Sequence, residues 1–188
     1  MGQDLGRKFY LREFKAISHA ISTYEDLNTL INHLTEGTSR AFEAKGCSIM
    51  LLDERENQLF HVGSYGLSEK YLRKGPVMVE NKNCAICTGK PVFIEDMQND
   101  PFVQYPEAAA REGIASMLSI PIKHRGAIVG ILRIYHGEPW VFHEEDLDSL
   151  SVLCDLLGLV IENNGLRNFL DQVKLALGSL PLRMLKGL

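Results

Sequence analysis

The chain has 188 residues, of which 45% are hydrophobic and 23% are charged. This composition is sufficient for one globular domain with helical extensions. The net charge of −4 at pH 7 and the absence of a basic run argue against a surface that binds nucleic acid through its phosphates.

The first eight residues carry charges but no apolar stretch behind them, so they do not resemble a secretory signal. The apolar runs in the sequence are too short to span a bilayer. We therefore expect a cytoplasmic protein without a transmembrane segment, in which the four cysteines are reduced thiols.

Apolar residues at helical spacing predict two helices in the first quarter of the chain. The first covers about residues 9–23, and the second about residues 24–44. Thr23 or Asp26 can cap the second helix, and Gly46 follows its C-terminal end.

Five short apolar segments then predict strands, and polar turns join two pairs of them into hairpins. Residues 66–83 between them are expected to be irregular, whereas short helices are expected at residues 84–88 and about 107–111. A long helix begins near His143 and extends as far as Ser179. The predicted strands are residues 47–52, 59–65, 91–94, 116–122 and 128–135.

Hairpins in the middle and helices at both ends indicate an α+β fold, in which an antiparallel sheet carries the helices on one face. We predict three parts along the chain. These are an N-terminal helix over residues 1–24, a domain over residues 25–164 and a C-terminal helical extension over residues 165–188.

Five segments, in the same order along the chain, resemble the GAF domain family. They are Thr88–Asp96 (TGKPVFIED), Asn99–Phe102 (NDPF), Gly113–Ile122 (GIASMLSIPI), Gly126–Leu132 (GAIVGIL) and Trp140–Leu147 (WVFHEEDL). The resemblance covers about residues 25–164. It implies helices on one sheet face and, on the other, a ligand cavity roofed by residues 66–111. It also implies a small-molecule- or redox-responsive sensor that acts on a downstream signalling protein. The family has many ligands, so no ligand or cofactor is named by it.

The Cys84-Ala85-Ile86-Cys87 segment is the most distinctive local feature of the sequence. Two thiols at this spacing can form a disulfide or supply half of a metal site, or they can simply be small buried residues of the roof. Because Cys47 and Cys154 lie on a predicted strand and helix and no second C-x-x-C occurs, we predict no metal site within one chain.

The same resemblance implies an enzymatic alternative, since some GAF proteins reduce free methionine sulfoxide with cysteines above the pocket. Here Cys84 or Cys87 would be the nucleophile and the other the resolving thiol. A ligand-free interaction module is the third possibility. His136-Gly137 stands where cyclic-nucleotide-binding members carry Asn-Lys, and no Cys-His pair is present for a bilin.

Three further residues are candidates for the pocket. Arg133 lies in the middle of a predicted strand, where it either reaches solvent or faces the cavity and holds an anionic ligand. Tyr105 and Tyr135 either line the pocket or are ordinary aromatic residues at the edge of the core.

The closing helix carries a heptad pattern that predicts a homodimer. With Leu156 at position a, Asn163 also falls at a, where an asparagine fixes the register of paired helices. The alternatives are that the pattern packs within one chain, or that the basic, leucine-rich residues 166–188 lie on a membrane or another protein. The predicted dimer residues are Leu159, Asn163, Leu166, Leu170, Val173 and Leu177.

Overall fold

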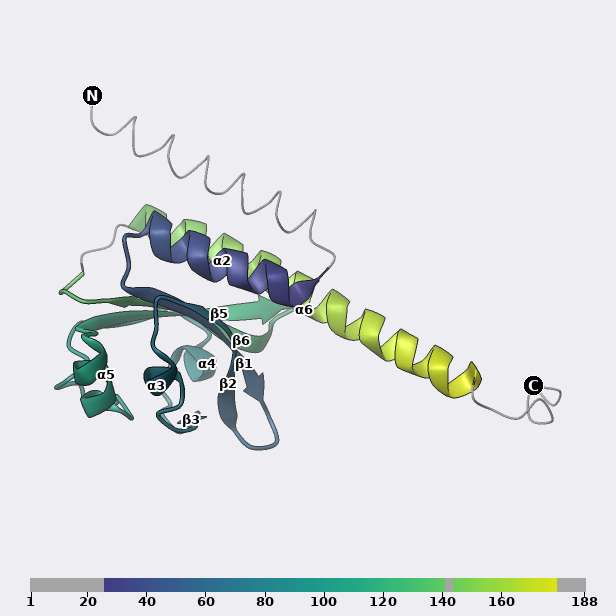
Figure 1. Cartoon of the computed structure of the whole chain (residues 1–188), viewed down its shortest axis with the longest axis horizontal. Helices are drawn as coiled ribbons and strands as arrows, with labels where there is room; N and C mark the ends of the chain where they lie inside the picture. The colour runs from purple at the N-terminus through teal and green to yellow at the C-terminus, as the bar shows by residue number, and fades with distance from the viewer. Residues whose placement is uncertain (1–25, 141–143, 179–188) are drawn as a thin grey trace, which may run out of the picture.

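The computed structural model describes residues 26–140 and 144–178, with side chains beyond Leu166 described only for Asn168. The predicted N-terminal helix over residues 1–24 lies outside the described residues. Figure 1 shows three layers, with helices α2 (Leu27–Ala41) and α6 (Glu144–Gly178) on one face of a sheet and short elements on the other.

The sheet has six strands in the order β3-β2-β1-β6-β5-β4, and every neighbouring pair is antiparallel. This arrangement confirms the predicted α+β class and both predicted hairpins. The pairing of β1 with β6 joins the two hairpins into one sheet. The strands are β1 (Gly46–Asp53), β2 (Gln58–Tyr65), β3 (Val77–Met78), β4 (Val92–Ile94), β5 (Ser116–His124) and β6 (Ala127–His136).

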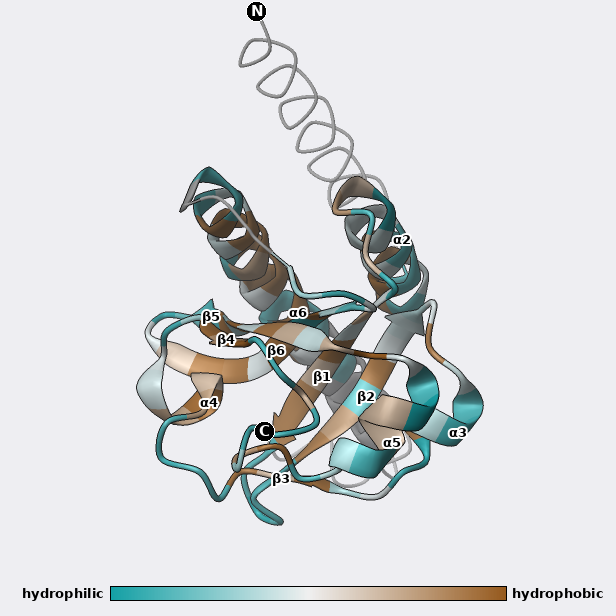
Figure 2. Ribbon diagram, turned by 90° about the vertical axis from the view of Figure 1, so that its left-hand side faces the viewer, coloured by the Kyte–Doolittle hydropathy of each residue, from teal (hydrophilic) through white to brown (hydrophobic). Residues whose placement is uncertain are grey.

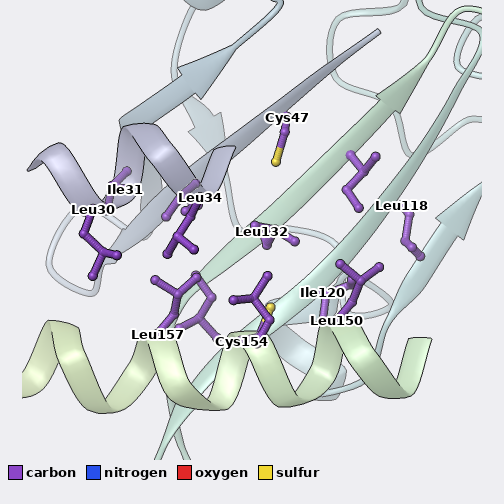
Figure 3. Close-up of a cluster of buried hydrophobic side chains, with 14 residues drawn as sticks. Leu30, Ile31, Leu34, Cys47, Leu118, Ile120, Leu132, Leu150, Cys154 and Leu157 are labelled. Atoms are coloured by element: carbon purple, nitrogen blue, oxygen red, sulfur yellow. The ribbon is translucent and has the colours of Figure 1, made fainter. Parts of the chain in front are cut away.

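The main hydrophobic core lies between the sheet and the two long helices. Successive residues of a strand face opposite sides of a sheet, so Cys47 and Ile49 of β1 enter this core while Met50 faces away from it. Figure 3 shows the side chains of α2, α6 and the strands pointing toward one another. The buried residues of this core include Leu30, Ile31, Leu34, Leu118, Ile120, Leu132, Leu150, Leu153, Cys154 and Leu157.

Helix α2 begins at the predicted cap. Asp26 Oδ2 accepts hydrogen bonds from Thr29 N at 2.9 Å and from Thr29 Oγ1 at 2.6 Å. The helix ends at Ala41, three residues earlier than predicted, because Glu43 adopts a positive φ of 49° in the turn that leads to β1.

Two glycines permit close approach of the backbones that form the core. A Cβ atom at Gly130 of β6 would lie 2.3 Å from the Met50 carbonyl oxygen. A Cβ atom at Gly158 of α6 would lie 1.9 Å from the Lys123 carbonyl oxygen of β5. The helix is therefore seated directly on the end of this strand.

Short elements form a second layer over the opposite face of the sheet, as Figure 2 shows. These are α3 (Glu69–Leu72), β3, α4 (Ala85–Thr88) and α5 (Pro106–Glu112), which we call the roof together with their loops. Residues 66–83 were expected to be irregular, but they contain α3 and β3. A helix of four residues is too short to show a periodic pattern in the sequence. A contact from α5 holds α3 in place, since Glu112 Oε1 accepts a hydrogen bond from Ser68 N at 2.8 Å.

Helix α6 continues without interruption through the predicted domain boundary between residues 164 and 165. Its stretch Glu145–Leu166 is long and apolar enough to cross a membrane by length and composition alone. The inner side of this stretch is buried against the sheet through Leu150, Leu153 and Leu157. The core helix of a globular domain has the same character.

Candidate functional site

A cavity of about 250 Å³ lies between the sheet and the roof. Its floor is formed by β5 and β6, and its walls come from β2, β3, β4, α4 and the loop before α5. Most of its surface is apolar. The apolar residues that line it include Leu59, Val77, Ile86, Val92, Met117 and Ile131.

Arg133 lies on the cavity side of β6, in the register of the sheet that also places Ser119 beside it. The side chain is half-buried, and its Nε donates a hydrogen bond to Ser119 Oγ at 3.1 Å. The sequence left open whether Arg133 reaches solvent or faces the cavity, and in the structure it lines the cavity. The hydroxyl holds the guanidinium at the floor, and neither Nη nitrogen has a hydrogen-bond partner among the described residues.

Lys74 follows α3 and brings a second positive charge to the cavity. Its Nζ donates to the Tyr71 carbonyl oxygen at 3.3 Å and lies 3.9 Å from the centroid of the Tyr71 ring. Burial, followed by the positive charge of Arg133, lowers the Lys74 pKa to about 8. Sequence analysis missed this residue, because nothing in an irregular loop showed which of its charges would turn inward.

His61 lies on β2 and faces the same side of the sheet as Met50, with which it pairs after a β-bulge. Both ring nitrogens are buried and have no hydrogen-bond partner among the described residues. Burial first, then the charges of Lys74 and Arg133, lower the His61 pKa to about 4. The imidazole is therefore neutral at pH 7. Nothing in the sequence distinguishes His61 from the other five histidines.

In the described part of the chain no ion pair joins a carboxylate to either cation, although the charge of Glu112 partly offsets the lowering of the Lys74 pKa. Within the described ranges, neither Lys74 nor Arg133 has a carboxylate oxygen within 4 Å, and the three ion pairs lie on exposed helix turns. Asp100 lines the cavity, but its Oδ1 accepts a hydrogen bond from Phe102 N at 2.8 Å and so shapes a turn. The polar end of the cavity is therefore positively charged.

Tyr105 lines the cavity and fixes the roof. Its hydroxyl donates to the Pro76 carbonyl oxygen at 2.7 Å, and Gly75 passes so close that a Cβ there would lie 2.5 Å from the same hydroxyl. Gln104, which sequence analysis missed, accepts from Met78 N at 3.0 Å and donates to Met78 O at 2.7 Å. These bonds tie the loop before α5 to β3.

Tyr135 faces the same side of the sheet but does not line the cavity. It is fully buried, packs edge-on against Tyr71 with the ring centroids 5.8 Å apart, and its hydroxyl lies 3.2 Å from Ser48 Oγ. The structure therefore places Cys84, Tyr105 and Arg133 at one cavity, and Tyr135 and Cys87 outside it.

The four cysteines are free thiols in different surroundings. Cys84 lines the cavity and begins α4, where its Sγ accepts a hydrogen bond from Cys87 N at 3.4 Å. Cys87 is exposed, and the hydrogen bond with Cys84 raises its pKa. Cys47 and Cys154 are buried on the helix side of the sheet, where burial raises the pKa of both thiols. In the described part of the chain, no three His, Cys, Asp or Glu side chains gather closely enough to hold a metal ion.

Helix α6 carries a stripe of exposed apolar residues on the side that faces away from the sheet. Val152, Leu159 and Leu166 are 45%, 53% and 54% exposed, and they are seven residues apart. Asn163 is also exposed, and Leu156 is half-buried. Leu170, Val173 and Leu177 lie in the same helix, but their side chains fall outside the described part.

Comparison with known proteins identifies a family model and many solved structures. A model described as GAF domain matches residues 26–161. The GAF domain of a phosphoenolpyruvate-protein phosphotransferase from Coxiella burnetii has a TM-score of 0.73 and 21% identity, covering 85% of this chain and 96% of that one. The corresponding domain from Acinetobacter has a TM-score of 0.71 and 23% identity, with 81% and 92% covered.

A free methionine-R-sulfoxide reductase from Neisseria meningitidis, solved with its substrate, has a TM-score of 0.68 and 18% identity. The match covers 81% of this chain and 88% of the reductase. No curated protein sequence matches the chain. At these identities the solved structures establish a shared fold, and they include GAF domains of phosphotransferases and a reductase.

Proposed function

The chain belongs to the GAF domain family, and from this premise we propose that it is a small-molecule sensor domain. In this proposal a ligand binds in the cavity between the sheet and the roof, and α6 of two chains forms a homodimer that passes the signal to a downstream protein. The carrying observation is the cavity of about 250 Å³, with apolar walls and a few convergent polar groups. Ligand sites generally have this character.

The size of the cavity favours a small ligand. Pockets for small molecules typically enclose roughly 300–1,000 Å³, so this cavity of about 250 Å³ lies just below that range. An open cavity also favours sensing over the ligand-free interaction module, whose interior would be filled by side chains.

The exposed stripe on α6 supports the homodimer. Leucines that remain about half exposed on a helix are unfavourable in water, and a spacing of seven residues matches the seam of a coiled coil. A second copy of α6 would cover Leu159 and Leu166 and would place two Asn163 side chains at the a position. The predicted residues Leu170, Val173 and Leu177 extend the same seam.

Strand β5 offers a physical connection between the cavity and this helix. Met117 and Ser119 of β5 line the cavity, while Lys123 at the end of the strand touches α6 at Gly158. A ligand that shifts β5 would thereby shift the helix. The ligand can change the population of two arrangements of the dimer only to the extent that it binds one of them more tightly than the other.

Native mass spectrometry of the purified full chain tests this function, because it reports bound small molecules and subunit number together. We expect a dimer that carries a bound ligand, and we expect this ligand to be small enough to fit into the cavity. The Ile86→Trp variant, which fills the cavity from α4, should lose the ligand, whereas Cys87→Trp on the exposed side of the same helix should retain it. A ligand that persists in the Ile86→Trp variant would place binding elsewhere.

A thiol-dependent reductase of free methionine sulfoxide is the second candidate function. It is favoured by Cys84 at the cavity wall, with Cys87 one helical turn away. The sulfoxide oxygen would leave as water while the two thiols become a disulfide. The raised pKa of Cys87 works against it, since the thiolate is the reactive form, and Cys87 does not line the cavity.

Turnover with free methionine sulfoxide and a thiol reductant tests this candidate. A reductase should lose its activity in the Cys84→Ser variant. Activity that is absent in the natural chain, or unchanged in a Cys84→Ser, Cys87→Ser double variant, would rule the reductase out.

A further inference from the structure

Two cations, neither of which has a carboxylate oxygen within 4 Å among the described residues, define the polar end of the cavity. We propose that the ligand is a small carboxylate with an apolar body, whose carboxylate binds between Arg133 and Lys74. This inference rests on the proposed ligand-binding function and adds the chemical class of the ligand.

Arg133 is positioned to receive an anion at the cavity floor. Its Nε is held by Ser119 Oγ at 3.1 Å, and this bond orients the planar guanidinium. The two Nη nitrogens have no hydrogen-bond partner among the described residues. A guanidinium presents paired N–H groups that match the two oxygens of a carboxylate.

Lys74 adds a charge that has no carboxylate oxygen within 4 Å among the described residues, although the negative charge of Glu112 partly offsets the lowering of the Lys74 pKa. It is half-buried and is held near the cavity by the Tyr71 carbonyl oxygen at 3.3 Å. Two like charges that share a poorly hydrated space repel each other, and the lowered pKa of Lys74 reflects both effects. A bound anion would relieve this repulsion.

Nearby acidic groups are engaged elsewhere. Asp100 accepts the hydrogen bond of Phe102 N at 2.8 Å, and Glu112 accepts that of Ser68 N at 2.8 Å. His61 is close enough to both cations that their charges lower its pKa, and its buried nitrogens lack a partner in the described part of the chain. The imidazole is neutral at pH 7 and therefore adds no further positive charge near this end of the cavity.

The remaining walls indicate what the anion carries. Ile86, Val92, Met117 and Ile131 surround the space beyond the two cations. A small inorganic anion would leave these walls facing water, whereas a carboxylate with an apolar body would cover them. A charged anchor in a mostly apolar cavity therefore favours an amphipathic acid.

Phenylacetate and its neutral analogue phenylacetamide provide the test, because they share shape and differ in charge. Both are titrated into the ¹⁵N-labelled full chain while amide chemical shifts are followed. We expect phenylacetate to shift the amides of the cavity and to bind at least about tenfold more tightly than phenylacetamide, since hydrogen bonds to a charged group are the stronger ones.

Charge-removing variants locate the anchor. Arg133→Gln and Lys74→Gln should each weaken phenylacetate about tenfold or more and leave phenylacetamide unchanged. Arg73→Gln is the matched control, because Arg73 is adjacent but exposed and paired with Glu69 at 2.9 Å. The dispersion of the amide spectrum shows that each variant is folded.

Two results would overturn the inference, and they are distinguishable. Equal affinity for both compounds, with no effect of Arg133→Gln or Lys74→Gln, would reject the anionic ligand and leave the binding cavity intact. If neither compound shifts the cavity amides, the anionic ligand is rejected and the proposed sensor function fails with it.

Discussion

His61 shows how the two cations act on a neighbouring side chain. Its imidazole is buried, lacks a partner among the described residues, and faces the positive charges of Lys74 and Arg133, so that its pKa falls to about 4. The unfolded chain, with a histidine pKa near 6.5, takes up a proton first as the pH falls. His61 therefore favours the folded state above about pH 6.5, and this contribution is lost between about pH 6.5 and pH 4.

The His61→Leu variant should remove this pH dependence. The difference in unfolding free energy between pH 7 and pH 4.5 should become smaller than in the natural chain by roughly 2 kcal/mol, after allowance for partial exposure. Urea unfolding at the two pH values measures it. A pH dependence that persists unchanged in the His61→Leu variant would contradict this assignment.

Lys74 predicts that anion binding is linked to proton uptake. With its pKa at about 8, the free amine is mostly neutral at pH 8.5, and a bound carboxylate would restore the charged form. Phenylacetate should therefore take up part of a proton at this pH. Calorimetry in Tris and in triethanolamine measures the uptake, and a Lys74→Gln variant that takes up as much would contradict the assignment.

At the residue scale, the sequence predicted the part of the site that lies on regular elements. Arg133 was a candidate because a charge in the middle of a strand is costly unless it has a function or reaches solvent. Lys74 and His61 could not be found in this way. The first depends on how an irregular loop folds inward, and the second on a β-bulge that shifts the register of β2.

At the element scale, two glycines of α6 have opposite roles that sequence alone does not separate. Both weaken a helix by about 1 kcal/mol relative to alanine. A Cβ at Gly158 would meet the Lys123 carbonyl oxygen at 1.9 Å, whereas a Cβ at Gly165 has nothing within 4 Å. The first glycine is required by packing, and the second is not.

Alanine at the two positions should therefore change stability in opposite directions. Gly158→Ala should lower the unfolding free energy by about 1–3 kcal/mol, because the helix must move away from β5. Gly165→Ala should raise it by up to about 1 kcal/mol. Urea unfolding of the two variants is the measurement, and equal effects would show that α6 is not seated on β5 as described.

The elements themselves were predictable where a pattern was long enough. The hairpins β1–β2 and β5–β6 follow from apolar segments joined by polar turns, and α2 follows from its periodicity and its Asp26 cap. The pairing of β1 with β6 joins residues about 80 positions apart, and no local signal records it. The short elements α3 and β3 were missed because they are held by contacts from distant segments.

At the scale of the whole molecule, the sheet separates two functions. One face packs against α2 and α6, and the short elements of the roof lie over the other face, as Figure 1 shows. This second face forms the floor of the cavity. The exposed stripe of α6 is then the surface through which we expect two chains to meet.

Charged substitutions on this stripe should separate the dimer. Leu159→Lys and Leu166→Lys should each raise the dimer dissociation constant at least about tenfold, because they bury an unpaired charge in the seam. Asn168→Lys, at an exposed position of α6 outside the seam, is the control. Analytical ultracentrifugation measures all three, and a natural chain that sediments as a monomer would contradict the dimer.

The most direct test of the account asks where an anionic ligand lies. Isotope-filtered NOE spectroscopy of the methyl-labelled full chain with phenylacetate measures contacts between the ring protons and individual methyl groups. We predict contacts to Ile86, Met117 and Ile131, all of which line the cavity. Contacts confined to the exposed stripe of α6, or no contacts at all, would contradict a binding cavity between the sheet and its roof.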